Sequence, residues 1–159
     1  MFSQWKKGEY TVSTDRYRID SKMIHDFLVQ NSYWAQDRQF EVTLAAINNS
    51  LCFGLYDGAD RQVGFARIIT DYATFAYIAD LFVLPQHQRR GLGKWLVHCI
   101  LECPALSMVR SWELRTADAH GLYSRFGFKP APTPENIMVL KRTPVPVVRY
   151  HEFAFAADT

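Results

Sequence analysis

Residues 80–94 read Asp-Leu-Phe-Val-Leu-Pro-Gln-His-Gln-Arg-Arg-Gly-Leu-Gly-Lys, and the interpretation of the whole chain starts from this stretch. An apolar segment runs into Pro85, a basic turn with two glycines follows, and an amphipathic segment begins at Leu92. This order predicts a strand, a tight turn and a helix. Backbone N–H groups and the positive end of the helix dipole would then point at one spot, which favours a bound anion such as a phosphorylated cofactor.

The well-known phosphate-binding loops do not fit this turn. A Walker loop needs Ser or Thr after its lysine, and Lys94 is followed by Trp95. A dinucleotide fold needs Gly-x-Gly-x-x-Gly, and only Gly91 and Gly93 are present. The pattern Gln88-x-x-Gly91-x-Gly93 resembles the acetyl-coenzyme A loop of the GNAT (GCN5-related) N-acetyltransferase superfamily. Glycines there let the backbone approach the pyrophosphate, because no Cβ is in the way.

A second motif supports the resemblance. Residues 114–128 read Leu-Arg-Thr-Ala-Asp-Ala-His-Gly-Leu-Tyr-Ser-Arg-Phe-Gly-Phe. The family carries a strand followed by Asn-x-x-Ala-x-x-Leu-Tyr-x-x-x-Gly-Phe at this distance from the loop, and the matching residues here are Ala119, Leu122, Tyr123, Gly127 and Phe128. Thr116 replaces the usual Asn. Asp118 is the expected N-cap of this short helix, and Gly127 its expected C′ residue.

The resemblance covers residues 5–142 and implies an α+β fold with three layers, α/β/α. Its mixed, mostly antiparallel sheet is expected to splay between the fourth and fifth strands. The residue pattern itself predicts strands at 10–14, 51–56, 62–69, 75–83, 109–115, 128 and 137–140. Helices are predicted after an Asp20 cap, over 40–47, from the glycine loop onward, and around Tyr123. Residues 143–159 are expected to form a separate C-terminal tail.

The resemblance also implies where acetyl-CoA, the expected co-substrate, would bind. Its pantetheine arm lies between the splayed strands, the N–H of Val83 meets the thioester carbonyl, and Leu81 and Phe82 flank the arm. The complete set of expected contacts is Leu81, Phe82, Val83, Gln88, Arg89, Arg90, Gly91, Leu92, Gly93, Lys94, Thr116, Tyr123 and Phe126.

Tyr123 is the candidate general acid of the transfer reaction. A phenol with a pKa of about 10 stays protonated at neutral pH and donates to a thiolate with a pKa of about 8.5. The alternative is an ordinary core tyrosine on a short helix.

The general base is open. Relatives that use a Glu place it at a position matching Tyr77 or Ala79, and neither is acidic here. Asp80 lies one residue away, and strand alternation predicts that it faces the opposite side of the sheet. His120 titrates in the right range, and a water chain without a single base is the third option.

The acceptor is expected to be a primary amine of a small molecule. The resemblance places the acceptor wall at the first helix and the loop after it, where Tyr33 and Trp34 offer apolar contact or cation–π attraction. Trp34 as a plain core residue is the alternative. Glu41 on the second helix and Tyr77 on the fourth strand complete the expected substrate-binding set. A peptide or protein amine, or a non-catalytic acyl-CoA sensor, are the competing functions.

Composition limits the remaining classes. The 159 residues suit one domain, and 48% apolar residues can fill its core. A net charge of +2 is too small to suggest nucleic acid or a membrane as partner. No apolar run is long enough to span a membrane and the N-terminus lacks a signal-peptide core, so a cytoplasmic protein is expected. The three cysteines are predicted to be buried, reduced thiols, and no metal site is expected. A homodimer is compatible with the apolar tail.

Overall fold

The computed structural model describes residues 1–143. Its six strands form one sheet in the order β1-β2-β3-β4-β5-β6. The strands are β1 (Gln4–Lys7), β2 (Tyr10–Ser13), β3 (Leu51–Tyr56), β4 (Gln62–Thr70), β5 (Phe75–Val83) and β6 (Ser111–Leu114). The helices are α1 (Ser21–Asn31), α2 (Phe40–Asn48), α3 (Leu92–Leu101) and α4 (His120–Ser124). All of these elements belong to one compact unit, Met1–Phe128.

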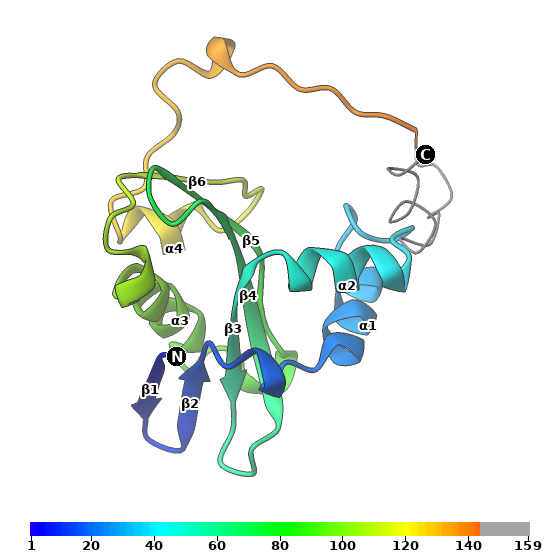
Figure 1. Ribbon diagram of the computed structural model, residues 1–159, viewed down its shortest axis with the longest axis vertical. Coiled ribbons are helices and arrows are strands. Elements are labelled where there is room, and N and C mark those ends of the chain that lie inside the picture. Colours follow the sequence, from blue (N-terminus) through cyan, green and yellow to red (C-terminus); the bar gives the residue numbers. More distant parts are fainter. Residues whose placement is uncertain (144–159) are drawn as a thin grey trace, which may run out of the picture. The chain divides into compact units, whose positions relative to one another are not determined.

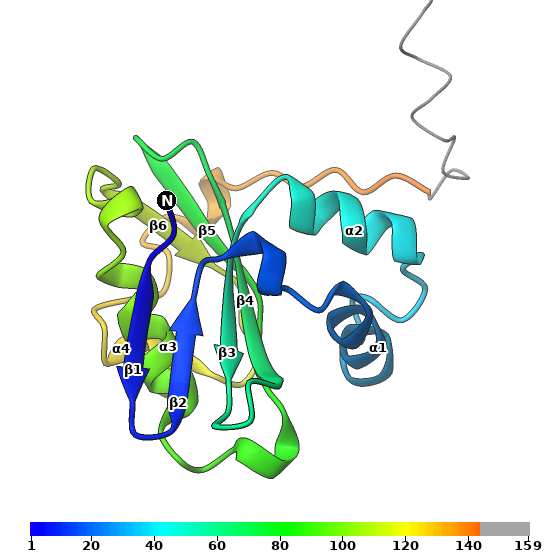
Figure 2. The same ribbon diagram turned by 60° about the horizontal axis from the view of Figure 1, so that its bottom comes forward.

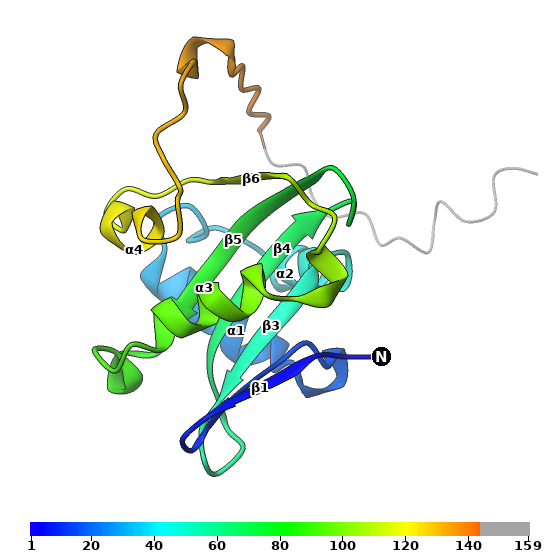
Figure 3. The ribbon, with the colours of Figure 1, turned by 90° about the vertical axis from the view of Figure 1, so that its left-hand side faces the viewer.

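Helices cover both faces of the sheet. Helices α1 and α2 lie on one face, and α3 and α4 lie on the other (Figures 1 and 3). Each face has its own core, one built around Ile24, Leu28 and Phe65 and the other around Phe53, Leu96 and Ile100. The predicted α+β fold with three layers is therefore confirmed.

The sheet opens between its last two strands. Neighbouring strands from β1 to β5 run antiparallel, whereas β6 runs parallel to β5. The parallel pairing extends only from Phe75 opposite Ser111 to Ile78 opposite Leu114. Strand β5 continues to Val83 with no strand paired on that side in the described part of the chain. This is the splay that the sequence predicted between its fourth and fifth strands.

Two predicted helices form for the predicted reasons. The Asp20 side chain accepts a hydrogen bond from the N–H of Met23 at 3.0 Å and so caps α1. Ile24 and Leu28 of that helix are buried beneath it. Helix α3 buries Leu92, Leu96, Cys99 and Ile100, the four residues expected from its apolar spacing.

The N-terminal hairpin was not fully predicted. Only the segment beginning at Tyr10 carried a strand pattern, yet β1 precedes it and pairs with it, and the hairpin extends the sheet beyond β3 (Figure 2). β1 contains one apolar residue, Trp5, among polar Gln4, Lys6 and Lys7, so it carries no alternating strand pattern; the Trp5 ring lies 6.0 Å from that of Phe53.

The two final strands predicted at Phe128 and over 137–140 are wrong. Described residues 129–143 contain a single 3-10 turn, Pro134–Asn136, and no strand. Pro130, Pro132 and Pro134 each lack the N–H that a strand would donate. Phe128 instead donates its N–H to the carbonyl of Tyr123 at 3.3 Å, which helps to close α4.

A β-bulge changes the predicted direction of Asp80. The register between β4 and β5 shifts between Phe65 and Arg67, and Asp80 adopts φ +52°. Asp80 accepts a hydrogen bond from Arg67, whose cross-strand partner is Ala79. Asp80 therefore lies on the same face as Ala79, and the prediction from strict alternation is wrong because the extra residue interrupts the alternation.

We expect Leu96→Ala to lower the free energy of unfolding by about 2–5 kcal/mol, because the side chain is fully buried and a cavity would remain. Leu44→Ala, on the exposed side of α2, is the matched control and should cost less than about 1 kcal/mol. Urea denaturation of both variants gives the comparison. Equal losses would contradict the described packing of α3.

Candidate functional site

The glycine loop presents unoccupied backbone donors. Gly91 is the N-cap of α3 with φ +75°, a conformation that glycine adopts without a Cβ penalty, and no side chain caps the helix. The first helical hydrogen bond runs from the N–H of Trp95 to the carbonyl of Gly91, so the three N–H groups before it have no intrahelical partner. A Cβ built on Gly91 or Gly93 would meet no atom within 4 Å. The loop therefore offers both donors and open space to an anion.

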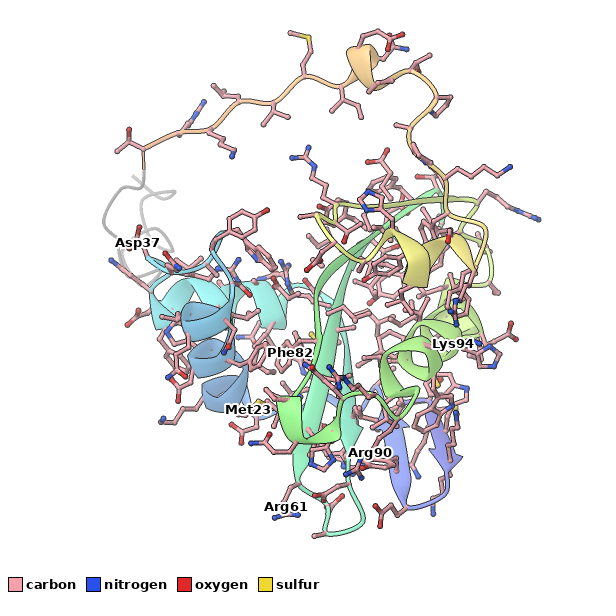
Figure 4. All side chains as sticks on the ribbon, turned by 180° about the vertical axis from the view of Figure 1, so that it is seen from behind. Met23, Asp37, Arg61, Phe82, Arg90 and Lys94 are labelled. Atoms are coloured by element: carbon pink, nitrogen blue, oxygen red, sulfur yellow. The ribbon has the colours of Figure 1, made fainter. Side chains whose placement is uncertain are left out.

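Side chains hold this loop to the sheet. An Arg90 guanidinium nitrogen donates to the hydroxyl of Tyr10 at 3.0 Å, and the same hydroxyl lies 2.9 Å from Nδ1 of His87. Nε2 of Gln88 donates to the carbonyl of Val83 at 2.9 Å. Arg90 therefore lies between the loop and the N-terminal hairpin (Figure 4), and two of the expected cofactor contacts, Arg90 and Gln88, use their side chains within the protein. The side chains of Arg89 and Lys94 are exposed.

The edge of β5 toward β6 is free beyond Ile78. The N–H of Leu84 donates to Val63 on β4 at 2.8 Å. Because backbone groups of successive residues point to opposite edges, those of Leu81 and Val83 point toward the gap. The side chains of Leu81, Phe82 and Val83 alternate between the two faces of the sheet. Leu81 and Val83 pack with the α3 core, and Phe82 stacks on Phe27 of α1 with ring centroids 4.0 Å apart.

Tyr123 is buried on α4, next to Phe128 at a ring distance of 5.8 Å. Burial disfavours the charged phenolate and raises the pKa of Tyr123 to about 12. Its hydroxyl has no hydrogen-bond partner within residues 1–143. At neutral pH the group is thus a protonated donor without a protein acceptor.

Thr116 and Gly127 fix the two ends of α4. The Thr116 hydroxyl accepts a hydrogen bond from the N–H of Ala119 at 2.9 Å, and Ala119 is the N-cap. The predicted Asp118 cap is wrong, because the N-cap is Ala119 and the N–H of Ala119 donates to the Thr116 hydroxyl. Gly127 has φ +91° and donates to Ser124, which confirms it as the C′ residue. Phe126, another expected cofactor contact, is half-buried after the helix.

The two candidate bases have opposite surroundings. The side chain of Asp80 is 5% exposed, receives a hydrogen bond from Nε of Arg67 at 2.8 Å and lies 3.5 Å from Nη1 of Arg38. His120 is exposed at the first turn of α4. Asp80 is therefore a buried ion-pair partner, while His120 keeps its ring in solvent.

The expected acceptor-wall residues are largely exposed. Tyr33 and Trp34, in the loop between α1 and α2, are 75% and 57% exposed and stack edge to face at 5.1 Å. The alternative that Trp34 belongs to the core is therefore wrong. Glu41 is exposed in the first turn of α2, and Tyr77 is half-buried on β5 opposite Ile69.

Sequence reasoning missed Arg38 and Arg67. Both guanidinium groups lie beside Asp80, with side chains 18% and 12% exposed. A single arginine in a polar loop and one in an apolar strand carry no motif. The available signal was Arg67 within the otherwise apolar run of β4, since a charge there needs a buried partner.

The described residues contain neither of two other kinds of feature, a metal-ligand cluster and a membrane-spanning helix. Within residues 1–143, no group of three or more His, Cys, Asp or Glu side chains could hold a metal ion. Over the same range no helix is both long and apolar enough to cross a bilayer. Cys52, Cys99 and Cys103 are buried and free, as predicted, and burial raises the pKa of Cys52 and of Cys99 to about 12.

Comparison with known proteins gives one consistent family. A sequence model described as an acetyltransferase (GNAT) domain matches residues 48–130. A crystal structure from Xanthomonas campestris, assigned to the GNAT acetyltransferases, is 44% identical, covers 86% of this chain and 96% of its own, and superposes with a TM-score of 0.81. A Staphylococcus aureus structure described as a probable acetyltransferase is 26% identical over 84% of this chain and 99% of its own, with a TM-score of 0.65.

Curated relatives are longer than the matched region. A Gibberella zeae protein assigned as an acetyltransferase is 34% identical over 62% of this chain, and a Pyropia yezoensis protein named an uncharacterized N-acetyltransferase is 29% identical over 60% of it. The chain spans 66% and 57% of the lengths of these two relatives.

We expect Gly91→Ala to weaken coenzyme A binding at least tenfold in isothermal titration calorimetry, because the new Cβ would occupy the open space above the loop. Gly8→Ala is a matched control, since Gly8 also has positive φ and open space around its Cβ position but lies in the β1–β2 turn. Both variants carry similar backbone strain. Equal affinities for coenzyme A in the two variants would contradict the placement of the anion site.

Proposed function

The chain belongs to the GNAT family of acetyltransferases, and from this premise we propose that it transfers the acetyl group of acetyl-CoA to a primary amine of a small molecule. One observation carries the proposal: the uncapped N-terminus of α3, with its open Gly91 turn, follows directly after the unpaired edge of β5. An anion cradle and a free strand edge are what a diphosphate joined to an amide-containing arm requires.

The residues present fit two parts of coenzyme A, its diphosphate and its pantetheine arm. The N–H groups of Leu92, Gly93 and Lys94 would hold the diphosphate, and the exposed charges of Arg89 and Lys94 would add attraction that salt screens. The backbone groups of Leu81 would pair with the pantetheine arm as a strand partner does, and the N–H of Val83 would be kept for the thioester carbonyl. This arrangement would direct the thioester along β5 into the splay.

The transfer reaction needs three contributions from the chain: stabilisation of the carbonyl oxygen, removal of the amine proton and protonation of the departing thiolate. Acetyl-CoA supplies an activated acetyl thioester, and the attacking amine must be neutral, because an ammonium has no free lone pair. The N–H of Val83 would stabilise the developing charge on the carbonyl oxygen. The hydroxyl of Tyr123 would donate a hydrogen bond, and then its proton, to the departing thiolate.

The proton of the amine is proposed to leave through water. Asp80 already accepts from Arg67 and faces Arg38, so its carboxylate is engaged in ion pairs. The ring of His120 is exposed at the start of α4 and is free to accept a proton from a water chain. Asp80 is assigned a positioning role, whereas His120 is the candidate at the end of the relay.

Purified protein, acetyl-CoA and a panel of amines test the proposal. The panel contains amino acids, polyamines, amino sugars and a peptide with a free N-terminus. We expect release of free thiol together with a product heavier by one acetyl group for at least one small amine. Calorimetric binding of coenzyme A without transfer to any acceptor would indicate a non-catalytic sensor, and transfer to the peptide alone would indicate a peptide-modifying enzyme.

Tyr123→Phe should lower kcat at least tenfold and leave coenzyme A affinity within about threefold, because it removes a proton donor but little contact area. Tyr17→Phe, at a 94% exposed position, is the control. Since burial raises the pKa of Tyr123 to about 12, its proton is retained as the pH rises from 7 to 10. A fall of kcat in that range that disappears in Tyr123→Phe would contradict this role.

A further inference from the structure

Arg38 is a largely buried cation whose hydrogen-bonding groups are unused. Its side chain is 18% exposed, and Nη1 lies 3.5 Å from Oδ2 of Asp80. That nitrogen is buried without a hydrogen bond, and within residues 1–143 no other side-chain nitrogen of Arg38 makes one. A guanidinium carries five N–H donors, and of the Arg38 nitrogens only Nη1 is both buried and, among the described residues, unpaired, so Nε and Nη2 are the donors that a ligand can reach.

The negative charge of Asp80 is shared unequally between two arginines. Arg67 donates from Nε to Oδ2 at 2.8 Å and from Nη1 to the hydroxyl of Ser50 at 3.2 Å, which fixes its guanidinium. Arg38 approaches the same oxygen without a hydrogen bond. Two positive charges and one negative charge leave this cluster with a formal charge of +1.

The acidic side chains near Arg38 in sequence do not cancel this charge. Asp37 and Glu41 are exposed, and Asp37 lies at the outer side of the α1–α2 layer, away from Phe82 and the sheet (Figure 4). Asp80 is the only ion-pair partner of Arg38 within residues 1–143. An excess cation held mostly out of water is costly unless a negative group meets it.

The cluster lies where an acceptor would meet the thioester. Asp80 follows Ile78, the last residue of β5 that pairs with β6, by two positions, and it precedes Val83 by three. Three residues of strand span roughly 10 Å. Arg38 belongs to the same α1–α2 loop as the exposed rings of Tyr33 and Trp34. Asp80, which faces Arg38, thus lies at most about 10 Å along β5 from Val83, the expected position of the acetyl carbonyl.

We propose that Arg38 binds a carboxylate of the acceptor, so that the preferred substrates are amines that also carry a carboxylate group. A guanidinium fork matches a carboxylate in two parallel hydrogen bonds, which gives orientation as well as attraction. Asp80 then holds the fork in place from the protein side. This inference rests on the proposed acetyl transfer and names the substrate class of that same site.

Matched amine pairs test this preference: phenylalanine against phenethylamine, and γ-aminobutyrate against butylamine. The kcat/KM of each is measured for the unaltered protein and for Arg38→Gln, Arg38→Lys and Arg61→Gln. We expect the carboxylate-bearing member to be preferred at least tenfold, mainly through KM. Arg38→Gln should lower that preference at least tenfold, and Arg38→Lys, which keeps the charge but not the fork, should lower it less.

Arg61→Gln is the control, because Arg61 pairs with Asp57 on the surface and its side chain is 75% exposed. It should leave the preference unchanged. Thermal melting of each variant shows whether it folds. If Arg38→Gln does not fold, Arg38→Lys decides the question. A folded Arg38→Lys with a reduced preference for the carboxylate-bearing amine would support the Arg38 site, and one with the full preference would contradict it.

Calorimetry of the carboxylate-bearing amines with protein saturated in coenzyme A separates this inference from the transfer itself. Transfer to amines without a carboxylate that equals or exceeds transfer to carboxylate-bearing ones would overturn the inference and leave the proposed function standing. Absence of acetyl transfer to every amine tested would contradict the proposed function. In that case a carboxylate-dependent affinity that Arg38→Gln abolishes would still support the Arg38 site, and no measurable binding would overturn it.

Discussion

The buried hydrogen bond from Arg67 to Asp80 is the interaction on which the geometry of this molecule depends. It stabilises a residue with φ +52° inside β5, one of the two nine-residue strands of the sheet, a conformation that costs a non-glycine residue roughly 1–2 kcal/mol. Charge-assisted hydrogen bonds contribute about that much when both partners are shielded from water. Removal of Asp80 would leave two largely buried cations without their counter-charge, whereas removal of Arg67 would leave Asp80 with Arg38 as its remaining partner.

This one distortion sets the directions of the residues that follow. After the bulge, Phe82 turns toward α1, while Leu81 and Val83 pack toward α3 and present backbone groups to the gap. Without the inserted residue, the side chains of the last segment of β5 would exchange faces, since strand periodicity is two. The bulge also brings the carboxylate of Asp80 to the face that holds Arg38. The bulge therefore determines three things: the directions of the β5 side chains that follow it, the backbone groups at the free edge of β5, and the position of the Asp80 charge.

Much of the fold and of the glycine loop was predictable, because the deciding signals are local. Asp20 caps its own helix, Gly91 and Gly127 take the conformations that their turns need, and the four-residue spacing on α3 reports its buried face. Local backbone preferences act over a few residues and remain readable in one sequence.

The failures came from interactions that join distant segments. The direction of Asp80 depends on Arg67, thirteen residues away on another strand, and on an extra residue that no composition rule announces. The significance of Arg38 appears only when its loop is folded onto β5. Asp118 does not cap α4: Ala119 is the N-cap, and its N–H donates to the hydroxyl of Thr116 in the preceding turn. Ile137–Leu140 has strand-forming residues, but propensity needs a neighbouring strand to become structure.

The deep burial of the cysteines has a chemical consequence for a protein whose reaction would generate a thiol. Burial raises the pKa of Cys52 and of Cys99 to about 12, so both sulfurs are held as protonated thiols at physiological pH. Attack on a disulfide requires a thiolate anion and physical access, and these side chains offer neither. A disulfide of coenzyme A would therefore find no reactive sulfur at these two positions with which to form a mixed disulfide.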